Sequence, residues 1–366
     1  MNLHPDLSRQ AILRSCAEYL VSIQSPEGFF VSPDSKHQEI AIYQIESTWS
    51  LLQAYEALGE GRPAGRPYLL AAAAALDRFA ALQRPDGTVP HAALPEGYYR
   101  RAQEIVYEYT LARLEREGRV YPGSEMDETV FPQMGVTDGG LAIAARSFAI
   151  LSGEDRYRAM AFRALDHYCA IWNPSYLKEN SFVTFYGLAF ALVGFHAWGK
   201  EYPRAEEMVG EITRLLTEGP VWWGYSPSKL AIVGVGLLTV HGSRYADSHI
   251  RPALEALLEA GLEVFPGGYG MATEDGQQWG RYADIRGTVP LMIIMKAYDA
   301  VTGTQTFTSS DKYRRMLAWL ERNRQAAKAM DRPFYEIQKA DGAWFGSGTP
   351  VCLLPVWWAT GRFAAL

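Results

Sequence analysis

The feature that most constrains this 366-residue chain is an alternation between two kinds of helical segment. Apolar residues recur at helical spacing throughout, and we find no convincing run of the alternating residues typical of strands. Six of the helical segments are apolar on most sides, which predicts that they are buried on most sides. The segments that follow them carry a charged face, which predicts an outer position. The expected helices cover residues 7–23, 44–58, 66–82, 98–117, 138–152, 154–171, 181–199, 202–217, 227–241, 246–261, 287–302, 310–327 and 351–364.

The connections between these helices alternate in length. Each of the first five apolar helices passes to its charged partner through a short link that begins with glycine, at Gly59, Gly153, Gly199, Gly242 and Gly303. Glycine is a common stop signal for a helix, and a short link makes the two helices an antiparallel hairpin. The connections into the apolar helices are longer and richer in Gly, Pro, Trp and Tyr, and they cover residues 24–43, 118–137, 172–180, 218–226, 262–286 and 328–350.

These hairpins predict an all-α fold, an (α/α)6 toroid that the whole chain, residues 1–366, forms as a single domain. Five hairpins pair directly, and the N-terminal helix closes the ring against the C-terminal helix. The inner helices then run parallel, so the six long connections gather in a funnel at their N-terminal ends. Helix 98–117 is an addition near this funnel. An open helical solenoid is the competing arrangement, but the chain has no tight repeat period that would favour it.

Composition excludes several classes of function. The net charge is −6 and no Lys/Arg stripe is interleaved with aromatic residues, so we expect no nucleic-acid partner. The 3 cysteines are far apart, which argues against a zinc cluster or a disulfide framework and favours a reducing compartment. The N-terminus lacks a signal-peptide pattern, and the most apolar run, 182–198, is too short to span a bilayer. We therefore expect a cytoplasmic protein with no membrane span, metal or other cofactor; its oligomeric state stays open.

Three turns of one spacing carry a resemblance. They cover residues 24–28, 83–87 and 338–342, each begins with Gln and ends with Gly, and each follows an outer helix. Asp or Glu followed by Gly forms a tight turn, and the Gln side chain can hydrogen-bond the backbone of this turn. The turns resemble the Gln-x-x-Asp-Gly-x-Trp turns of the α/α-toroid superfamilies, which include six-hairpin glycosidases, polysaccharide lyases, terpenoid cyclases and prenyltransferases. Segments 46–59 and 147–157 also resemble hairpins of the glycan enzymes. The resemblance implies the toroid fold and leaves the reaction open.

One long connection concentrates carboxylates. Together with the start of the helix that follows, in the stretch 121–140, it holds Glu125, Asp127, Glu128 and Asp138, and Thr137-Asp138 is an N-cap candidate for that apolar helix. Carboxylates crowded at the start of such a helix can have their pKa values pushed apart, as acid/base catalysis requires. Hydrolysis of a glycoside takes two carboxylates about 5–10 Å apart. We therefore predict catalytic roles for Asp127, Glu128, Asp138 and Asp284, with Asp127 paired to Asp138 or Asp284.

The other connections offer groups suited to sugars. Aromatic rings stack on sugar faces, and Arg can grip a uronate carboxylate with two hydrogen bonds. For each Arg the alternative is a structural salt bridge, and for each Trp it is ordinary packing. A lone loop histidine does not indicate a metal site. The predicted substrate-binding residues are Glu125, His37, Tyr107, Asn180, Trp222, Trp223, Tyr225, Trp279, Arg281, Arg286 and Trp344.

We therefore predict a glycan-active enzyme, a glycoside hydrolase or a uronate lyase, that acts on an oligosaccharide or another small molecule. A tyrosine base with His37, Asn180 and Arg286 would suit the β-elimination of a lyase. A second hypothesis is isoprenoid chemistry, because residues 125–129, Glu-Met-Asp-Glu-Thr, resemble the Asp-x-Asp-Asp-Thr motif of class II terpenoid cyclases. That resemblance implies that Asp127 protonates an alkene, although two of the three acids are Glu here. A non-catalytic binding toroid is the third hypothesis.

Overall fold

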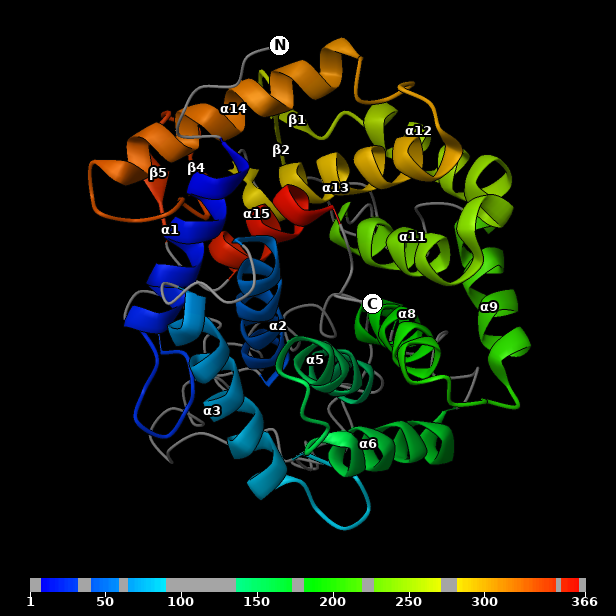
Figure 1. The fold of residues 1–366 in the computed structure, drawn as a ribbon. Helices are drawn as coiled ribbons and strands as arrows, with labels where there is room; N and C mark the ends of the chain where they lie inside the picture. The colour runs from blue at the N-terminus through cyan, green and yellow to red at the C-terminus, as the bar shows by residue number, and fades with distance from the viewer. Residues whose placement is uncertain are drawn as a thin grey trace, which may run out of the picture.

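The computed structural model of the chain describes residues 8–31, 41–58, 65–89, 136–172, 181–218, 227–270, 282–346 and 350–361. Six helices of this part form an inner ring, and six more lie outside it (Figure 1). The inner helices are α2 (Ala41–Leu58), α5 (Val136–Ser152), α8 (Ser181–Trp198), α11 (Pro227–His241), α13 (Ile285–Thr302) and α15 (Pro350–Thr360). The outer helices are α1 (Arg9–Ser22), α3 (Arg66–Leu82), α6 (Arg158–Ile171), α9 (Ala205–Glu218), α12 (Arg251–Glu259) and α14 (Asp311–Lys328).

The inner helices form a closed ring. Each packs against the next in chain order, from α2 to α15, and α15 packs back onto α2. The outer helix that follows each of the first five inner helices packs against it, while α1 packs against α15 and α2. The first and last helices thus complete the sixth hairpin, as Figure 1 shows. The predicted all-α toroid is confirmed, including its closure by the N-terminal helix.

The predicted helices match the observed ones closely, with one local difference and one helix left untested. The sequence analysis expected a helix over 246–261. The chain instead forms a 3₁₀ turn, Gly242–Tyr245, and a π-helical turn, Ala246–Ile250, before α12 begins. Pro252 has no N–H for the regular helical hydrogen bond, so it fits the first turn of an α-helix and not its interior. The predicted helix 98–117 lies outside the described residues.

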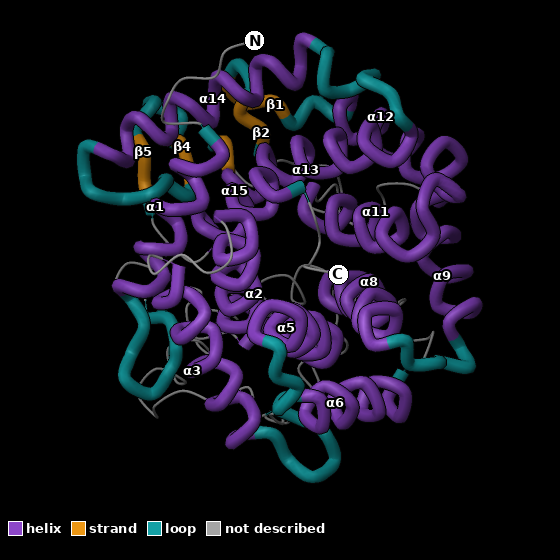
Figure 2. The backbone as a smooth tube through the Cα atoms, viewed as in Figure 1, coloured by secondary structure: helices purple, strands orange, loops and turns teal. Residues whose placement is uncertain are grey.

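Short strands, which the sequence analysis did not predict, accompany the later hairpins (Figure 2). Within the described ranges they are β1 (Glu263–Phe265), β2 (Gly268–Tyr269), β3 (Ala283–Asp284), β4 (Ile337–Gln338) and β5 (Trp344–Phe345). β1 pairs with β2, and β4 lies between β3 and β5, all antiparallel. Runs of two or three residues are too short to show the period-two pattern by which strands are recognised. The β3–β4 pair ties the connection before α13 to the one after α14.

The Gln turns hold neighbouring outer helices together. Gln83 Nε2 donates to the carbonyl oxygens of Gly87, at 3.1 Å, and of Met160 on α6, at 3.0 Å. Gly87 has a φ of 96°, and a Cβ there would lie 2.2 Å from the carbonyl oxygen of Arg163. Only glycine therefore lets this turn pack directly on α6. The turn at 24–28 binds α3 in the same way, so the predicted backbone hydrogen bond is confirmed.

Glycine also sets the packing of the inner ring. A Cβ on Gly139, near the start of α5, would lie 2.2 Å from the backbone carbonyl carbon of Phe190 on α8. The backbones of α5 and α8 are therefore in direct contact at this level. None of the helices in the described part of the chain combines the length and the apolar character needed to cross a membrane.

Candidate functional site

Buried polar side chains gather in the first turns of the inner helices, on what we call the N-terminal face of the ring. Further along, most positions of these helices are apolar; residues 230–238 of α11, for example, are all buried and apolar or glycine. Within the described ranges, the buried polar residues deeper in the inner helices are Ser50 and Gln53 on α2, Ser147 on α5 and Asp299 on α13. Removing polar groups from water costs free energy, so their concentration at one end marks a candidate site. The buried polar residues of this face, within the described ranges, are Gln44, Glu46, Ser47 and Thr48 on α2, Thr137 and Asp138 on α5, Lys229 on α11, and Asp284 and Thr288 at α13.

Aromatic rings fill the interior of the ring beneath these turns. The ring centroid of Trp49, on α2, lies 6.3 Å from that of Phe190 on α8 and 5.6 Å from that of Trp357 on α15. Because α5 separates α2 from α8, the contact between Trp49 and Phe190 crosses the interior. The three residues stand seven to nine positions after the starts of their helices. At a helical rise of 1.5 Å per residue this is a common depth of about 10–14 Å. We call Trp49, Phe190 and Trp357 the aromatic floor.

Glu46 lies between the N-terminal face and the aromatic floor. It precedes Trp49 by three residues, so the two share one side of α2, and helical side chains lean towards the N-terminus. Only 7% of Glu46 is exposed, and within the described part of the chain its carboxyl group makes no hydrogen bond or ion pair. Burial alone raises the pKa of Glu46 to about 8. Glu46 was not among the residues predicted from the sequence. A glutamate at a position of an inner helix that is expected to be buried is the sequence signal that could have identified it.

Asp138 is directed towards the outer layer. Its Oδ2 lies 3.1 Å from Nδ1 of His167, which is on the outer helix α6. Burial by itself would lower the pKa of His167, but the hydrogen bond and the charge of Asp138 oppose this and the pKa is raised. Asp138 therefore joins an inner helix to its outer partner.

Asp284 and Arg286 form the ion pair that the sequence analysis named as the structural alternative. The Asp284 side chain caps α13 by accepting a hydrogen bond from the Arg286 N–H, at 2.7 Å. An Arg286 guanidinium nitrogen lies 2.7 Å from Asp284 Oδ2 and 3.0 Å from Glu336 Oε1. Ser228 at the start of α11 donates to the Arg286 carbonyl oxygen, at 2.7 Å. Two carboxylates thus share this guanidinium at the N-terminal face.

Of the remaining predicted site residues, Trp344 packs against other aromatic rings, and the others lie outside the described part of the chain. The Trp344 ring, in β5, packs against Trp319 with centroids 5.5 Å apart and stacks on Tyr335 at 6.3 Å. The structure thus supplies a packing role for it beside α14. Asp138 and Asp284 both lie at starts of inner helices, but α8 and α11 separate α5 from α13, and each carboxylate binds its own partner. The other predicted site residues, His37, Tyr107, Glu125, Asp127, Glu128, Asn180, Trp222, Trp223, Tyr225, Trp279 and Arg281, lie outside the described residues.

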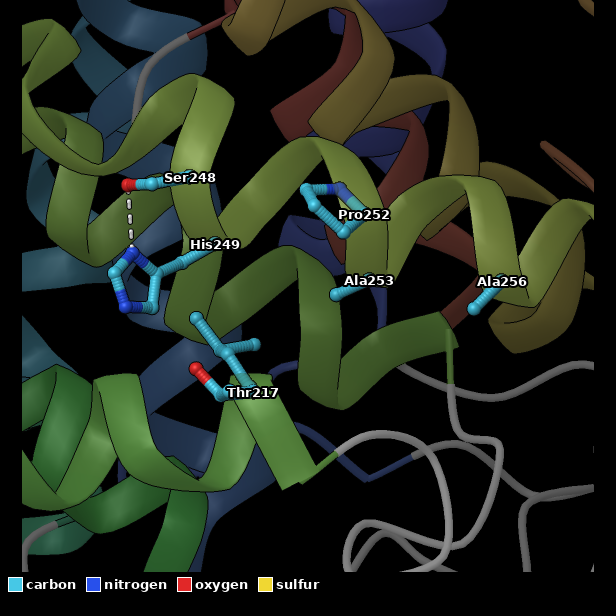
Figure 3. Close-up of a pocket in the computed structure, with 7 residues that line it drawn as sticks. Thr217, Ser248, His249, Pro252, Ala253 and Ala256 are labelled. Carbon is cyan, nitrogen blue, oxygen red and sulfur yellow. Dashed lines mark hydrogen bonds between the residues drawn. The ribbon is translucent and has the colours of Figure 1, made fainter.

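A separate groove lies in the outer layer between α9 and α12 (Figure 3). Its volume is about 210 Å³, and small apolar side chains such as Ala253 and Ala256 form much of its lining. Ser248 Oγ lies 2.7 Å from His249 Nδ1 at one edge. Pockets for small molecules usually measure about 300–1,000 Å³. The groove is smaller than that, and none of its lining residues belongs to the buried polar residues of the N-terminal face, so this face is the better candidate site.

Comparison with known proteins gives a similarity in fold. No family model matches the chain, and no curated protein has a significantly similar sequence. Across the described residues no group of three or more His, Cys, Asp or Glu is placed to hold a metal ion. Among solved structures, a crystal structure of D-mannose isomerase is similar, with a TM-score of 0.51 and 13% sequence identity over 98% of this chain and 99% of that chain. At this identity the similarity shows that the two chains share a fold along their whole lengths.

Proposed function

We propose that this protein is an enzyme that acts on a carbohydrate by proton transfer, with the substrate entering at the N-terminal face. The observation that carries this proposal is the layer of buried polar side chains above the aromatic floor. Sugars present apolar ring faces and many hydroxyl groups, so they need both kinds of surface in one place. A D-mannose isomerase that shares the fold along both chains gives independent support for a sugar as the substrate.

Among sugar reactions, we propose isomerisation or epimerisation first. These reactions move protons between neighbouring atoms, and one well-placed acid or base contributes a large part of the rate. Glycoside hydrolysis requires two carboxylates that face one bond. Asp138 and Asp284 each bind another side chain, which makes them poorer candidates for such a pair. Hydrolysis remains the second proposal because Asp127 and Glu128 stand close before α5 in the sequence.

A substrate panel tests the proposal. The purified protein is incubated with D-mannose, D-glucose and D-fructose in D₂O, and proton NMR follows loss of the signal at C2 and formation of a new sugar. Parallel samples contain 4-nitrophenyl glycosides, an unsaturated uronate disaccharide and geranylgeranyl diphosphate. We expect conversion of a free sugar. Release of nitrophenol would favour hydrolysis and conversion of the uronate would favour a lyase, while turnover of the diphosphate alone would contradict a carbohydrate substrate.

A further inference from the structure

The buried carboxylates of the described chain differ in how they are satisfied. Asp299, near the end of α13, accepts hydrogen bonds from the backbone N–H groups of Phe307 and Thr308 and so organises the loop before α14. Asp138 and Asp284 have a histidine and an arginine as partners. Glu46 is also buried, although at 7% exposure slightly less than the other three, and its carboxyl group has no such partner among the described residues. A residue kept for stability would be paired, because an unpaired buried carboxyl group opposes folding.

The position of Glu46 suits a group that meets a substrate. It stands five residues into α2, which at 1.5 Å per residue is about 8 Å below the N-terminal face. The aromatic floor lies about one turn deeper, so a sugar ring resting on it would bring its oxygens to the level of Glu46. The backbone at the start of α5 packs closely against the residue before Glu46, since a Cβ on Gly140 would lie 2.9 Å from a side-chain carbon of Ile45.

The geometry points to Glu46 as the catalytic acid of this site, a carboxylic acid that donates its proton to an oxygen of the bound sugar. This inference rests on the proposed function. It adds a catalytic residue that lies apart from the carboxylate-rich segment 125–138 of the sequence.

The proposed proton transfers balance between the substrate, Glu46 and one base. As a base removes the proton at C2 of an aldose, the π electrons of the carbonyl group move onto its oxygen and form a bond to the Glu46 proton. The electron pair of the broken O–H bond stays on the Glu46 carboxylate. This carboxylate then takes the proton of the neighbouring hydroxyl as the new carbonyl group forms, and the base returns its proton to C1. No oxidant or other reactant is consumed.

Burial keeps Glu46 in the form that this role requires. Its pKa of about 8 leaves the carboxyl group protonated at neutral pH, whereas an exposed glutamate would be ionised and unable to donate. Among the described residues burial is the cause of the shift, and no ionisable group on the described helices that pack against α2 contributes to it.

The experiment compares Glu46→Gln, Glu46→Asp and the control Glu56→Gln on whichever sugar of the panel the unchanged protein converts. Glu56 lies on the same helix, two to three turns further from the N-terminal face. We expect Glu46→Gln to lower kcat by about 100-fold or more, the usual contribution of a general acid, while KM changes by less than about threefold. Glu46→Asp keeps an acid and should retain more activity than Glu46→Gln, and Glu56→Gln should behave like the unchanged protein.

Thermal unfolding of each variant shows whether the fold is intact. If Glu46→Gln folds and keeps more than a tenth of the activity, the role of Glu46 is overturned while the proposed function stands. If it loses activity and Glu56→Gln loses as much, the assignment also fails, because the loss is not specific. If the unchanged protein converts no sugar of the panel, the proposed function is overturned, and the role of Glu46 with it.

Discussion

Replacing Glu46 by glutamine should stabilise the protein at neutral pH. The ordinary pKa of this group is 4.5, and burial raises it to about 8 in the folded state. Below pH 4.5 the group is protonated in both states and does not affect stability. Between pH 4.5 and 8 the unfolded chain releases the proton while the folded chain keeps it, so the free energy of unfolding falls as the pH rises. Glutamine has nearly the same shape and does not titrate.

The size of the effect follows from the shift. Each pH unit between the two pKa values costs about 1.4 kcal/mol, so at pH 7 the unchanged protein is destabilised by about 3 kcal/mol relative to pH 4.5. Glu46→Gln should therefore exceed the unchanged protein in free energy of unfolding by about 3 kcal/mol at pH 7, and the difference should largely vanish at pH 4.5. Urea unfolding followed by tryptophan fluorescence at several pH values measures both.

A control variant and two possible results test the predicted effect of Glu46→Gln on stability. The control Glu56→Gln should not show this gain in the free energy of unfolding at pH 7. The reasoning fails if Glu46→Gln is less stable than the unchanged protein at pH 7, or if its advantage is equal at every pH. The first result would mean that the ionised form of Glu46 stabilises the folded state, and the second that the stability difference does not come from the titration of Glu46. Together with lost turnover, a gain in stability would exclude unfolding as the reason for the loss.

Three further substitutions test the packing and the ion pairs by urea unfolding. Gly87→Ala should lower the free energy of unfolding more than Gly342→Ala. Both glycines have a positive φ, which costs an alanine about 1–2 kcal/mol of strain, but only a Cβ at position 87 would meet a carbonyl oxygen of α6. Equal losses would contradict this packing. Asp138→Asn should lower the free energy of unfolding more at pH 6 than at pH 9. Because Asp138 raises the pKa of His167 in the folded state, the pair stabilises the fold below the unfolded pKa of His167, and this contribution is lost as the pH rises through the folded pKa. A loss that does not depend on pH would argue against the pair. Arg286→Ala leaves two carboxylates without their shared cation and should cost about 3 kcal/mol; a cost near zero would show that the pair is not formed.

Much of the fold could be predicted because its determinants are local. An apolar stripe at helical period defines an inner helix within one segment, and a glycine such as Gly303, at φ 70°, ends it within one turn. Short links then force antiparallel neighbours. The prediction was wrong where the pattern was too short or too local to read: the two- and three-residue strands, and the turns before Pro252.

The candidate site was only partly predictable, for a physical reason. Residue type and spacing suggested Asp138, Asp284 and Arg286, and a salt bridge was the structural alternative for Arg286, but those properties do not indicate the partners that come from distant segments. His167 on α6 and Glu336 beside β4 supply those partners, and neither is near its counterpart in the sequence. The residues outside the described part of the chain, Asp127 and Glu128 among them, stay predictions.

The sequence by itself determined that this chain forms paired helices around an apolar ring, because helical period, glycine stops and link lengths act over a few residues each. Only the tertiary structure decided which polar groups are buried, and which of them find a partner in the described part of the chain. Glu46 stands out because Trp49, Phe190 and Trp357, from three distant segments, fill the space beneath it. The pKa of a carboxyl group depends on everything packed around it, and that environment exists only once the ring has closed.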